Sequence, residues 1–324
     1  MTSFCKVKLM AGFFNRRKID KGIDEYYGME EVKAPKKLKF SMLVIVALVL
    51  VFVVIVSIFS INLNNNSFKK FHRASIKNFE SSGFEYEVNA GINGENYMSY
   101  AGALEFDLRD QILESQYHAV YTDYEYDAVS YAHKSQAYRG NYYGGRWTVE
   151  EYTEKALDFF SFYRSYKRGE FDAGALVRFT ETNDIFRAVQ LRNSTMATIE
   201  ELSKPTAINN ILHQKIQSTE NGTVYTFTPD MDEVMAIVTR NVASAYSSAK
   251  EYNEVKQRID ESMTNLENAQ TTVSYTISLD KYLTDIEIVH IVNGDRYVIE
   301  IHMSNFGKTD VEVADGFLTA AGVE

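Results

Sequence analysis

The stretch FEYEVNAGINGENYMSYAGALEFD, residues 84–107, decides the fold because apolar and polar residues alternate along it on both sides of a turn signal. That signal is Asn93-Gly94, and Asn-Gly between two alternating runs is typical of a two-residue β-hairpin turn. The same period of two continues over residues 117–126 and 129–138. The sequence therefore predicts a meander of at least four antiparallel strands, with one apolar face and one solvated face.

A second alternating region occupies residues 273–303. Val273, Tyr275 and Ile277 alternate with Ser and Thr, and a second Asn-Gly pair, Asn293-Gly294, separates two further runs. This pattern predicts a three-stranded meander. The residues after it, 306–324, show no sustained period and are expected to form a loosely ordered C-terminal tail.

Helical periodicity occupies the middle of the chain. Residues 152–163 carry one apolar stripe, and Thr148 with Glu151 matches a capping box that would start this helix. Thr228-Pro229-Asp230 predicts the start of a second helix, with its stripe over residues 231–245. A further stripe over residues 252–266 continues it, either within one long helix or as the second of a pair.

Between these helices, residues 208–216 and 224–227 flank Asn221-Gly222 and predict a short hairpin, whereas residues 168–205 are hard to assign. The order is sheet, helix, short strands, helices, sheet. We therefore expect an α+β fold, in which a curved antiparallel sheet packs on helices.

The segment Ser41–Leu63 is the longest apolar run of the chain and holds no charge, glycine or proline. A helix of roughly 20 apolar residues spans the hydrocarbon core of a bilayer. We expect an uncleaved single-pass transmembrane anchor, because the apolar run is too long for a signal peptide and no small-residue cleavage site follows it.

Charge predicts the orientation of this signal-anchor. Residues 1–40 carry ten basic and five acidic side chains, a net +5, and the whole chain is −10, so the rest of the chain is −15. Basic residues beside a span favour the cytoplasmic side. The expected organisation is a cytoplasmic basic tail (1–40), the span (41–63), a tether with a juxtamembrane helix (64–80), an extracytoplasmic α+β domain (81–305) and the C-terminal tail (306–324).

The juxtamembrane helix has two interpretations. Residues 68–79 show a basic, partly apolar helical pattern. Such a helix can lie on the bilayer surface or form the first amphipathic helix of the domain.

Rows of aromatic residues on the apolar face are the candidate binding site. A tyrosine gives a wall both an apolar ring and a polar tip, but aromatic residues also pack across strands in ordinary cores. Both interpretations stay open. If the rows line a cavity, the ligand-binding residues are Phe84, Tyr86, Tyr100, Leu104, Phe106, Tyr124, Tyr126, Ile277 and Ile299.

Acids alternate with tyrosines in the same region. A single strand would place Asp123, Glu125 and Asp127 on one face and Tyr124 with Tyr126 on the other. Without a bulge, Tyr117 and Tyr121 would share the acidic face. A calcium site needs about six to eight converging oxygens, whereas a straight strand spreads its carboxylates, so we expect a solvated acidic face.

The sequence carries no recognisable catalytic constellation. Its single cysteine, Cys5, lies in the N-terminal tail, and its six histidines show no metal-ligand spacing. Nucleophile-elbow, phosphate-loop and dinucleotide motifs are absent, and the acidic outer part argues against nucleic acid as a partner. We expect no enzyme activity, no cofactor and no metal.

Three segments together resemble the LolA-type lipoprotein-carrier fold, which mycobacterial lipid-binding lipoproteins share. They are the strand motif Y-x-G-x-L-E-F-D at 100–107, the G-G-R-W at 144–147, and the Y-L-T-D-I-E-I at 282–288. The resemblance covers about residues 68–305 as a pattern. It implies a curved sheet around helices, with an apolar cavity for acyl chains or lipids. The chain departs from the lipoproteins because it lacks a lipobox cysteine and has an apolar span instead.

Two functions follow as hypotheses. The first is a bacterial cell-membrane protein, held in the lipid bilayer by one span, that binds a lipid or acyl ligand between sheet and helices. The second is a structural subunit of a cell-envelope or secretion assembly, which would contact an envelope protein through the stripe at 252–266.

Overall fold

The computed structural model describes residues 67–122, 124–134, 136–169, 200–245 and 269–323, with isolated helical positions at 194, 197, 198, 250, 252, 253, 256 and 257. The basic tail, the apolar run Ser41–Leu63 and the tether at 64–66 lie outside these residues, as do Asp123 and most of the stripe at 252–266. Within the described residues, no helix combines the length and apolarity needed to cross a membrane.

The described residues form one antiparallel sheet of eleven strands, in the order β6-β5-β4-β3-β2-β1-β11-β10-β9-β8-β7. The first six are β1 (Gly83–Ile92), β2 (Glu95–Asp107), β3 (Ile112–Tyr121), β4 (Glu125–His133), β5 (Gln136–Tyr143) and β6 (Arg146–Glu151). The others are β7 (Lys215–Thr219), β8 (Gly222–Phe227), β9 (Gln270–Ser278), β10 (Leu283–Val292) and β11 (Asp295–Ser304). The expected α+β class with a curved antiparallel sheet is confirmed.

Pairing of β1 with β11 joins the two predicted meanders into this single sheet. The register runs from Glu85 opposite Ser304 to Ile92 opposite Tyr297. Each meander keeps its own Asn-Gly turn, and Asn93 and Asn293 both have φ 53° with φ 89° at the following glycine. Two successive positive φ values define the type I′ turn, which matches the twist of the flanking strands.

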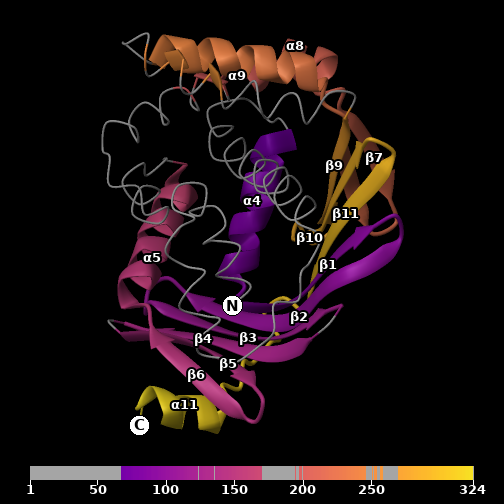
Figure 1. The fold of residues 1–324 in the computed structure, drawn as a ribbon. Helices are drawn as coiled ribbons and strands as arrows, with labels where there is room; N and C mark the ends of the chain where they lie inside the picture. Colours follow the sequence, from indigo (N-terminus) through magenta and orange to yellow (C-terminus); the bar gives the residue numbers. More distant parts are fainter. Residues whose placement is uncertain are drawn as a thin grey trace.

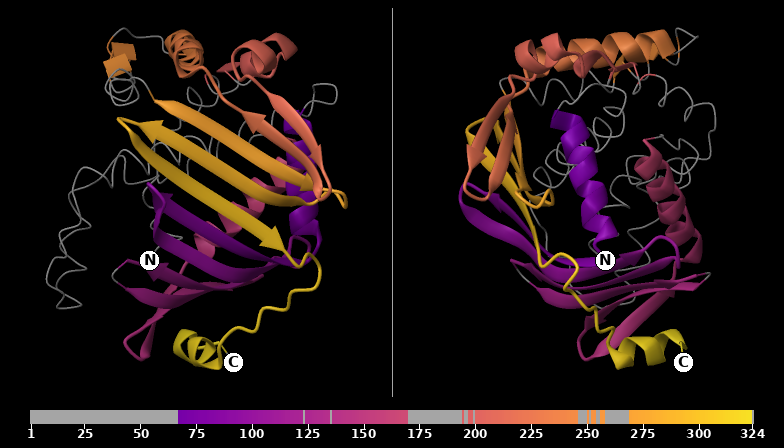
Figure 2. Two further views of the ribbon diagram at one scale, coloured as in Figure 1. Left: turned by 90° about the vertical axis from the view of Figure 1, so that its right-hand side faces the viewer. Right: turned by 180° about the vertical axis from the view of Figure 1, so that it is seen from behind.

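Five helices are described: α4 (Ser67–Glu80), α5 (Thr153–Arg168), α8 (Pro205–Asn210), α9 (Met231–Ala245) and α11 (Asp315–Ala321). Helices α4 and α5 lie inside the curve of the sheet, and α8 and α9 lie beyond its β7–β9 end (Figure 1). Helix α11 lies outside the curve, beside β6, at the end of an extended segment that crosses the outer face (Figure 2).

Helix α4 is the first helix of the domain, because its apolar side is buried in the sheet. Phe68 stacks on Phe227 with 5.1 Å between ring centroids, and Phe71 meets Tyr275 edge-on at 5.0 Å. Farther along, the Asn78 side chain bonds the backbone of Leu283. Of the two interpretations of residues 68–79, the structure therefore gives the amphipathic domain helix.

Two apolar clusters make up the described core. The larger one joins α4 to β1–β4 and β8–β11, with Leu202, Val234 and other residues of the α8–α9 region. The smaller one surrounds α5 and includes Phe106, Phe160 and Tyr163. Leu104 packs against both clusters, so the concave side of the sheet is one apolar surface.

The predictions that residues 117–126 and residues 129–138 each form one strand are wrong, and the second range divides into the end of β4 at His133 and the start of β5 at Gln136. Strand β3 ends at Tyr121 and β4 begins at Glu125, and the Tyr121 amide donates to the Tyr124 carbonyl at 2.8 Å. The chain therefore reverses direction between Tyr121 and Tyr124, where the sequence predicted a continuous strand. Thr-Asp is a weaker turn signal than Asn-Gly, and alternation alone does not reveal a reversal.

Three other local predictions are corrected. Thr148 lies in β6 rather than at a helix cap, and α5 begins after Tyr152, whose side chain makes no cap hydrogen bond. The segment 208–216 divides into the end of α8 and the start of β7 rather than forming one strand. The C-terminal tail is not loose, because α11 forms there and buries Phe317 completely.

Candidate functional site

All nine predicted binding residues lie on the concave face of the sheet. Directly paired residues of neighbouring strands project to the same face. The pairs Tyr86–Gly102 and Gly102–Tyr117 relate β1, β2 and β3, and Ala90–Ile299 relates β1 to β11. The helices α4 and α5 cover this face (Figure 1). The ligand-binding role of the nine residues stays a prediction.

The nine residues differ in how far neighbours cover them. Five belong to the larger cluster and are buried: Phe84, Tyr100, Tyr126, Ile277 and Ile299. Phe106 is buried in the smaller cluster, while Tyr86 and Leu104 are half-buried. Tyr124 remains 46 % exposed. The row therefore runs from the buried core to a residue that solvent reaches.

Six tyrosines gather where β2, β3 and β4 meet on the concave face, and we call them the tyrosine cluster: Tyr97, Tyr100, Tyr117, Tyr121, Tyr124 and Tyr126. Tyr121 and Tyr124 stack with centroids 4.6 Å apart and an interplanar angle of 9°. Tyr126 continues the stack at 6.3 Å from Tyr121. The hydroxyls of Tyr100 and Tyr121 are hydrogen-bonded to each other.

Burial favours the neutral form of two hydroxyls of this cluster. It raises the pKa of Tyr97 to about 12, with smaller contributions from the Tyr121 and Tyr297 phenols. Burial also raises the pKa of Tyr126. A neutral phenol both donates and accepts hydrogen bonds. The cluster therefore presents apolar ring faces with polar tips, which suits a ligand with both an apolar body and a polar group.

Sequence reasoning missed three members of the cluster: Tyr97, Tyr117 and Tyr121. The turn after Tyr121 reverses the chain, which turns Tyr117 and Tyr121 to the tyrosine side instead of the acidic side. Tyr97 lies at a register shift, because Ala90 pairs with Met98 and Gly91 pairs with Asn96. A β-bulge of this kind re-aims a side chain. Gly91, which interrupts the alternating run, was the sequence feature that could have indicated this bulge.

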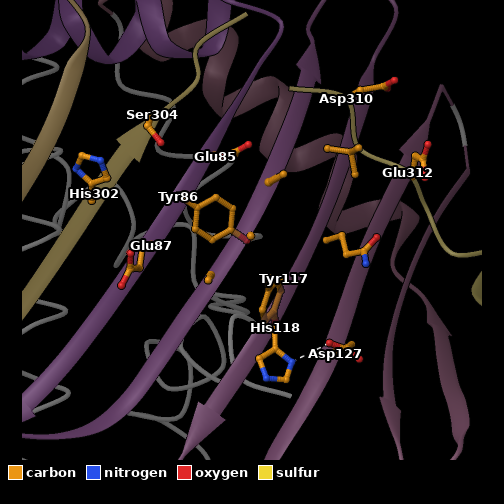
Figure 3. Close-up of a pocket in the computed structure, with 15 residues that line it drawn as sticks. Glu85, Tyr86, Glu87, Tyr117, His118, Asp127, His302, Ser304, Asp310 and Glu312 are labelled. Atoms are coloured by element: carbon orange, nitrogen blue, oxygen red, sulfur yellow. Dashed lines mark hydrogen bonds and ion pairs between the residues drawn. The ribbon is translucent and has the colours of Figure 1, made fainter. Parts of the chain in front are cut away.

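The opposite, convex face carries an open groove of about 610 Å³ (Figure 3). Its floor is Ala101 and Ala103 of β2, and acids of β1 and polar residues of β3 form its sides. Asp310 and Glu312 of the C-terminal segment line one end of the groove (Figure 3). The groove exists because the outward residues of β2 are small while their neighbours are long.

Two histidine–carboxylate pairs mark this groove. His118 Nδ1 lies 2.8 Å from Asp127 Oδ1, and His302 Nδ1 lies 2.8 Å from Asp285 Oδ1. Glu87 lies between the two histidines, because it pairs directly with His302 on one side and with Ala101 on the other, and Ala101 in turn pairs with His118. Within the part of the chain that the structure describes, no three histidine, cysteine or acidic side chains group as metal ligands would. The predicted solvated acidic face is thus observed for Glu125 and Asp127, both solvent-accessible.

No family model matches this chain, and no curated protein shows significant similarity to it. Among solved structures, the lipoprotein LppX of Mycobacterium tuberculosis is similar at 10 % identity and a TM-score of 0.32. The match covers 76 % of this chain and 97 % of LppX. Like the relatives named in the resemblance above, LppX is a mycobacterial lipoprotein. At this TM-score the similarity carries no argument about function, which rests on the residues described here.

Proposed function

We propose that this protein is a single-pass, membrane-anchored binding protein. Its N-terminal tail is cytoplasmic, and its α+β domain lies outside the membrane and holds a lipid or other apolar ligand against the concave face. The anchor is supported by the uncharged run Ser41–Leu63 and the basic residues before it. In this proposal the protein acts by binding, since among the described residues the aromatic site consists of apolar rings and phenol hydroxyls.

The tyrosine cluster is the observation that carries this proposal. Tyr100 and Tyr126 belong to the buried core, and Tyr121 and Tyr124 extend the same stack to solvent. Exposing a stacked aromatic pair beside an apolar core is unfavourable in water unless another surface covers it. A ligand lying along the concave face would cover Tyr124 and meet the phenol hydroxyls at its polar end.

Mass spectrometry of the domain tests the proposal. Residues 67–324 are expressed without the apolar run, measured under native conditions and then extracted with organic solvent. We expect a bound lipid mass that disappears on extraction, and uptake of a fluorescent fatty acid by the extracted protein. A clean apo mass with no uptake would contradict binding and would favour the envelope-assembly subunit instead.

A pair of matched variants locates the ligand. Tyr124→Ala should weaken fatty-acid uptake by about 2- to 10-fold, because an aromatic contact contributes about 0.5–1.5 kcal/mol. Tyr142→Ala is the control. Tyr142 is 39 % exposed, close to the exposure of Tyr124, but it pairs with Asp127 and so faces the convex side. Equal affinities for the two variants would place the ligand away from the tyrosine cluster.

A further inference from the structure

The distance between the apolar run and helix α4 limits where the membrane lies. The run ends at Leu63, and α4 begins at Ser67. Four residue steps extend to at most about 14 Å. If Ser41–Leu63 spans the bilayer as proposed above, the first turn of α4 must lie at the membrane surface.

The start of α4 is fixed to one end of the sheet. The Tyr275 hydroxyl donates to the Ser67 carbonyl at 2.7 Å, and Phe68 stacks on Phe227. These contacts tie the helix to β8 and β9 at its first two residues. The anchor therefore joins a packed element of the domain, and it brings the β7–β9 end of the sheet to the bilayer.

The surface at this end combines basic charge with an exposed apolar side chain. We define the membrane-proximal corner as Lys70 and Arg73 of α4 with Lys215 and Ile216 of β7. Lys70 Nζ lies 5.4 Å from the ring centroid of Tyr225, and Ile216 pairs with Tyr225. Ile216 is 58 % exposed on an edge strand whose residues are all exposed.

This composition is unusual for the chain, whose total charge is −10. Acids do border the corner, because Asp232 and Glu233 occupy the first turn of α9, shortly after Phe227. The described residues that define the corner are three cations and one apolar residue, with no acid among them. Basic side chains beside an apolar one match the surface of a bilayer that contains anionic lipids, since the ammonium groups reach headgroups while the apolar group enters the interface.

We propose that the membrane-proximal corner docks on the anionic surface of the bilayer that anchors the chain, so that the β7–β9 end of the concave face is held against the membrane. This inference rests on the proposed membrane anchor. It adds an orientation, in which the domain is not free to tumble on its tether. A ligand entering or leaving the concave face would then pass close to the bilayer.

Site-specific fluorescence on the full chain tests the orientation. Cys5→Ser removes the only natural thiol, and Ile216→Cys carries an environment-sensitive dye. The chain is placed in nanodiscs of phosphatidylcholine and phosphatidylglycerol that contain nitroxide-labelled lipid. We expect a blue-shifted emission that the nitroxide quenches, because the dye enters the lipid interface.

Leu279→Cys is the matched control site. Leu279 is also an exposed apolar residue, at 68 %, and it lies in the turn beside Lys77, whose ammonium donates to the Asp280 carbonyl. Lys77 is ten residues along α4 from Ser67, which corresponds to about 15 Å. We expect several-fold weaker quenching at this site than at residue 216.

Charge reversal isolates the electrostatic contribution to docking. The pair Lys70→Glu and Lys215→Glu should lower quenching at residue 216 to the level of residue 279, and high salt or pure phosphatidylcholine should act in the same direction. Equal quenching at both sites, or quenching at neither, in a chain that has entered the nanodisc would overturn the docking. Failure of the chain to enter the nanodisc would instead refute the anchor, and with it the proposed function.

Discussion

Asn78 is the residue that locks α4 onto the sheet. Its Nδ2 donates to the Leu283 carbonyl at 2.7 Å, and its Oδ1 accepts from the Leu283 amide at 3.0 Å. The side chain is 2 % exposed. It therefore satisfies the first backbone groups of β10, which would otherwise be buried without partners.

Replacing Asn78 by alanine should destabilise the domain by about 2–4 kcal/mol, because it removes two buried hydrogen bonds and leaves an amide and a carbonyl unpaired. Urea unfolding of the domain measures the change. Asn89→Ala is the control, since Asn89 bonds Glu87 on the solvated face and its loss should change stability by less than about 0.5 kcal/mol. Similar losses for the two variants would show that Asn78 does not hold the helix.

The sequence predicted the orientation of some side chains correctly and of others wrongly. It placed Phe84, Tyr86 and Tyr100 on the apolar face because alternation fixes the side of each residue within one strand. It placed Tyr117 and Tyr121 on the wrong side because their strand was read as continuous with the next one, and the missed turn inverts the side of the residues before it in that strand. The alternation of Tyr124 and Tyr126 was right, since both follow that turn.

Helix α11 is an element that the sequence did not predict. Phe317 is completely buried against Trp147, with ring centroids 5.4 Å apart. The absence of a side chain at Gly140 makes room for it, because a Cβ there would lie 3.0 Å from the Phe317 ring. A seven-residue helix has too few turns to show an apolar stripe, so only its docking site stabilises it.

Phe317→Ala should release α11 from the outer face. Removing a buried phenylalanine costs about 3–5 kcal/mol, which exceeds what a seven-residue helix can supply by itself. Trp147 is the only tryptophan of the chain, so its fluorescence reports the event directly. We expect a red-shifted emission and faster amide exchange in residues 315–321.

Thr319→Ala provides the control for this element, because Thr319 is exposed on the same helix. Its emission should match that of the unaltered protein. An unchanged emission in Phe317→Ala would mean that the helix is held by other contacts, such as the buried Val311 in the preceding segment.

The whole molecule is held together by the pairing of β1 with β11 and by burial on the concave side. Two histidines lie within this interior. Burial lowers the pKa of His72, whose Nε2 donates to the Tyr166 carbonyl at 2.7 Å, and burial likewise lowers the pKa of His290. His290 Nδ1 lies 2.9 Å from the Thr271 hydroxyl. Both imidazoles are therefore buried in the neutral form.

Acid should weaken the fold through these histidines. The unfolded chain takes up protons near the usual histidine pKa of about 6.5, whereas the folded chain resists protonation until lower pH. Stability is therefore retained above about pH 6.5 and falls as the pH drops toward the lowered folded-state values. Urea unfolding at a series of pH values measures the decline.

His290→Gln separates this effect from the titration of carboxylates, because both proteins keep every acid. The difference in unfolding free energy between the unaltered protein and the variant should shrink between about pH 8 and pH 5, since only the unaltered protein loses the His290 contribution. A difference that stays constant with pH would exclude His290 as a source of acid sensitivity.

The sequence by itself determined the strand periodicity, the hairpins at Asn93-Gly94 and Asn293-Gly294, the amphipathic helix after Ser67 and the α+β class, because each depends on neighbours within a few residues. Only the tertiary structure decided that β1 pairs with β11, that the β3–β4 turn gathers the tyrosines on one face, and that α11 docks beside Trp147. These features depend on contacts between residues far apart in the chain. Their free energy comes from burying surfaces that no local pattern brings together.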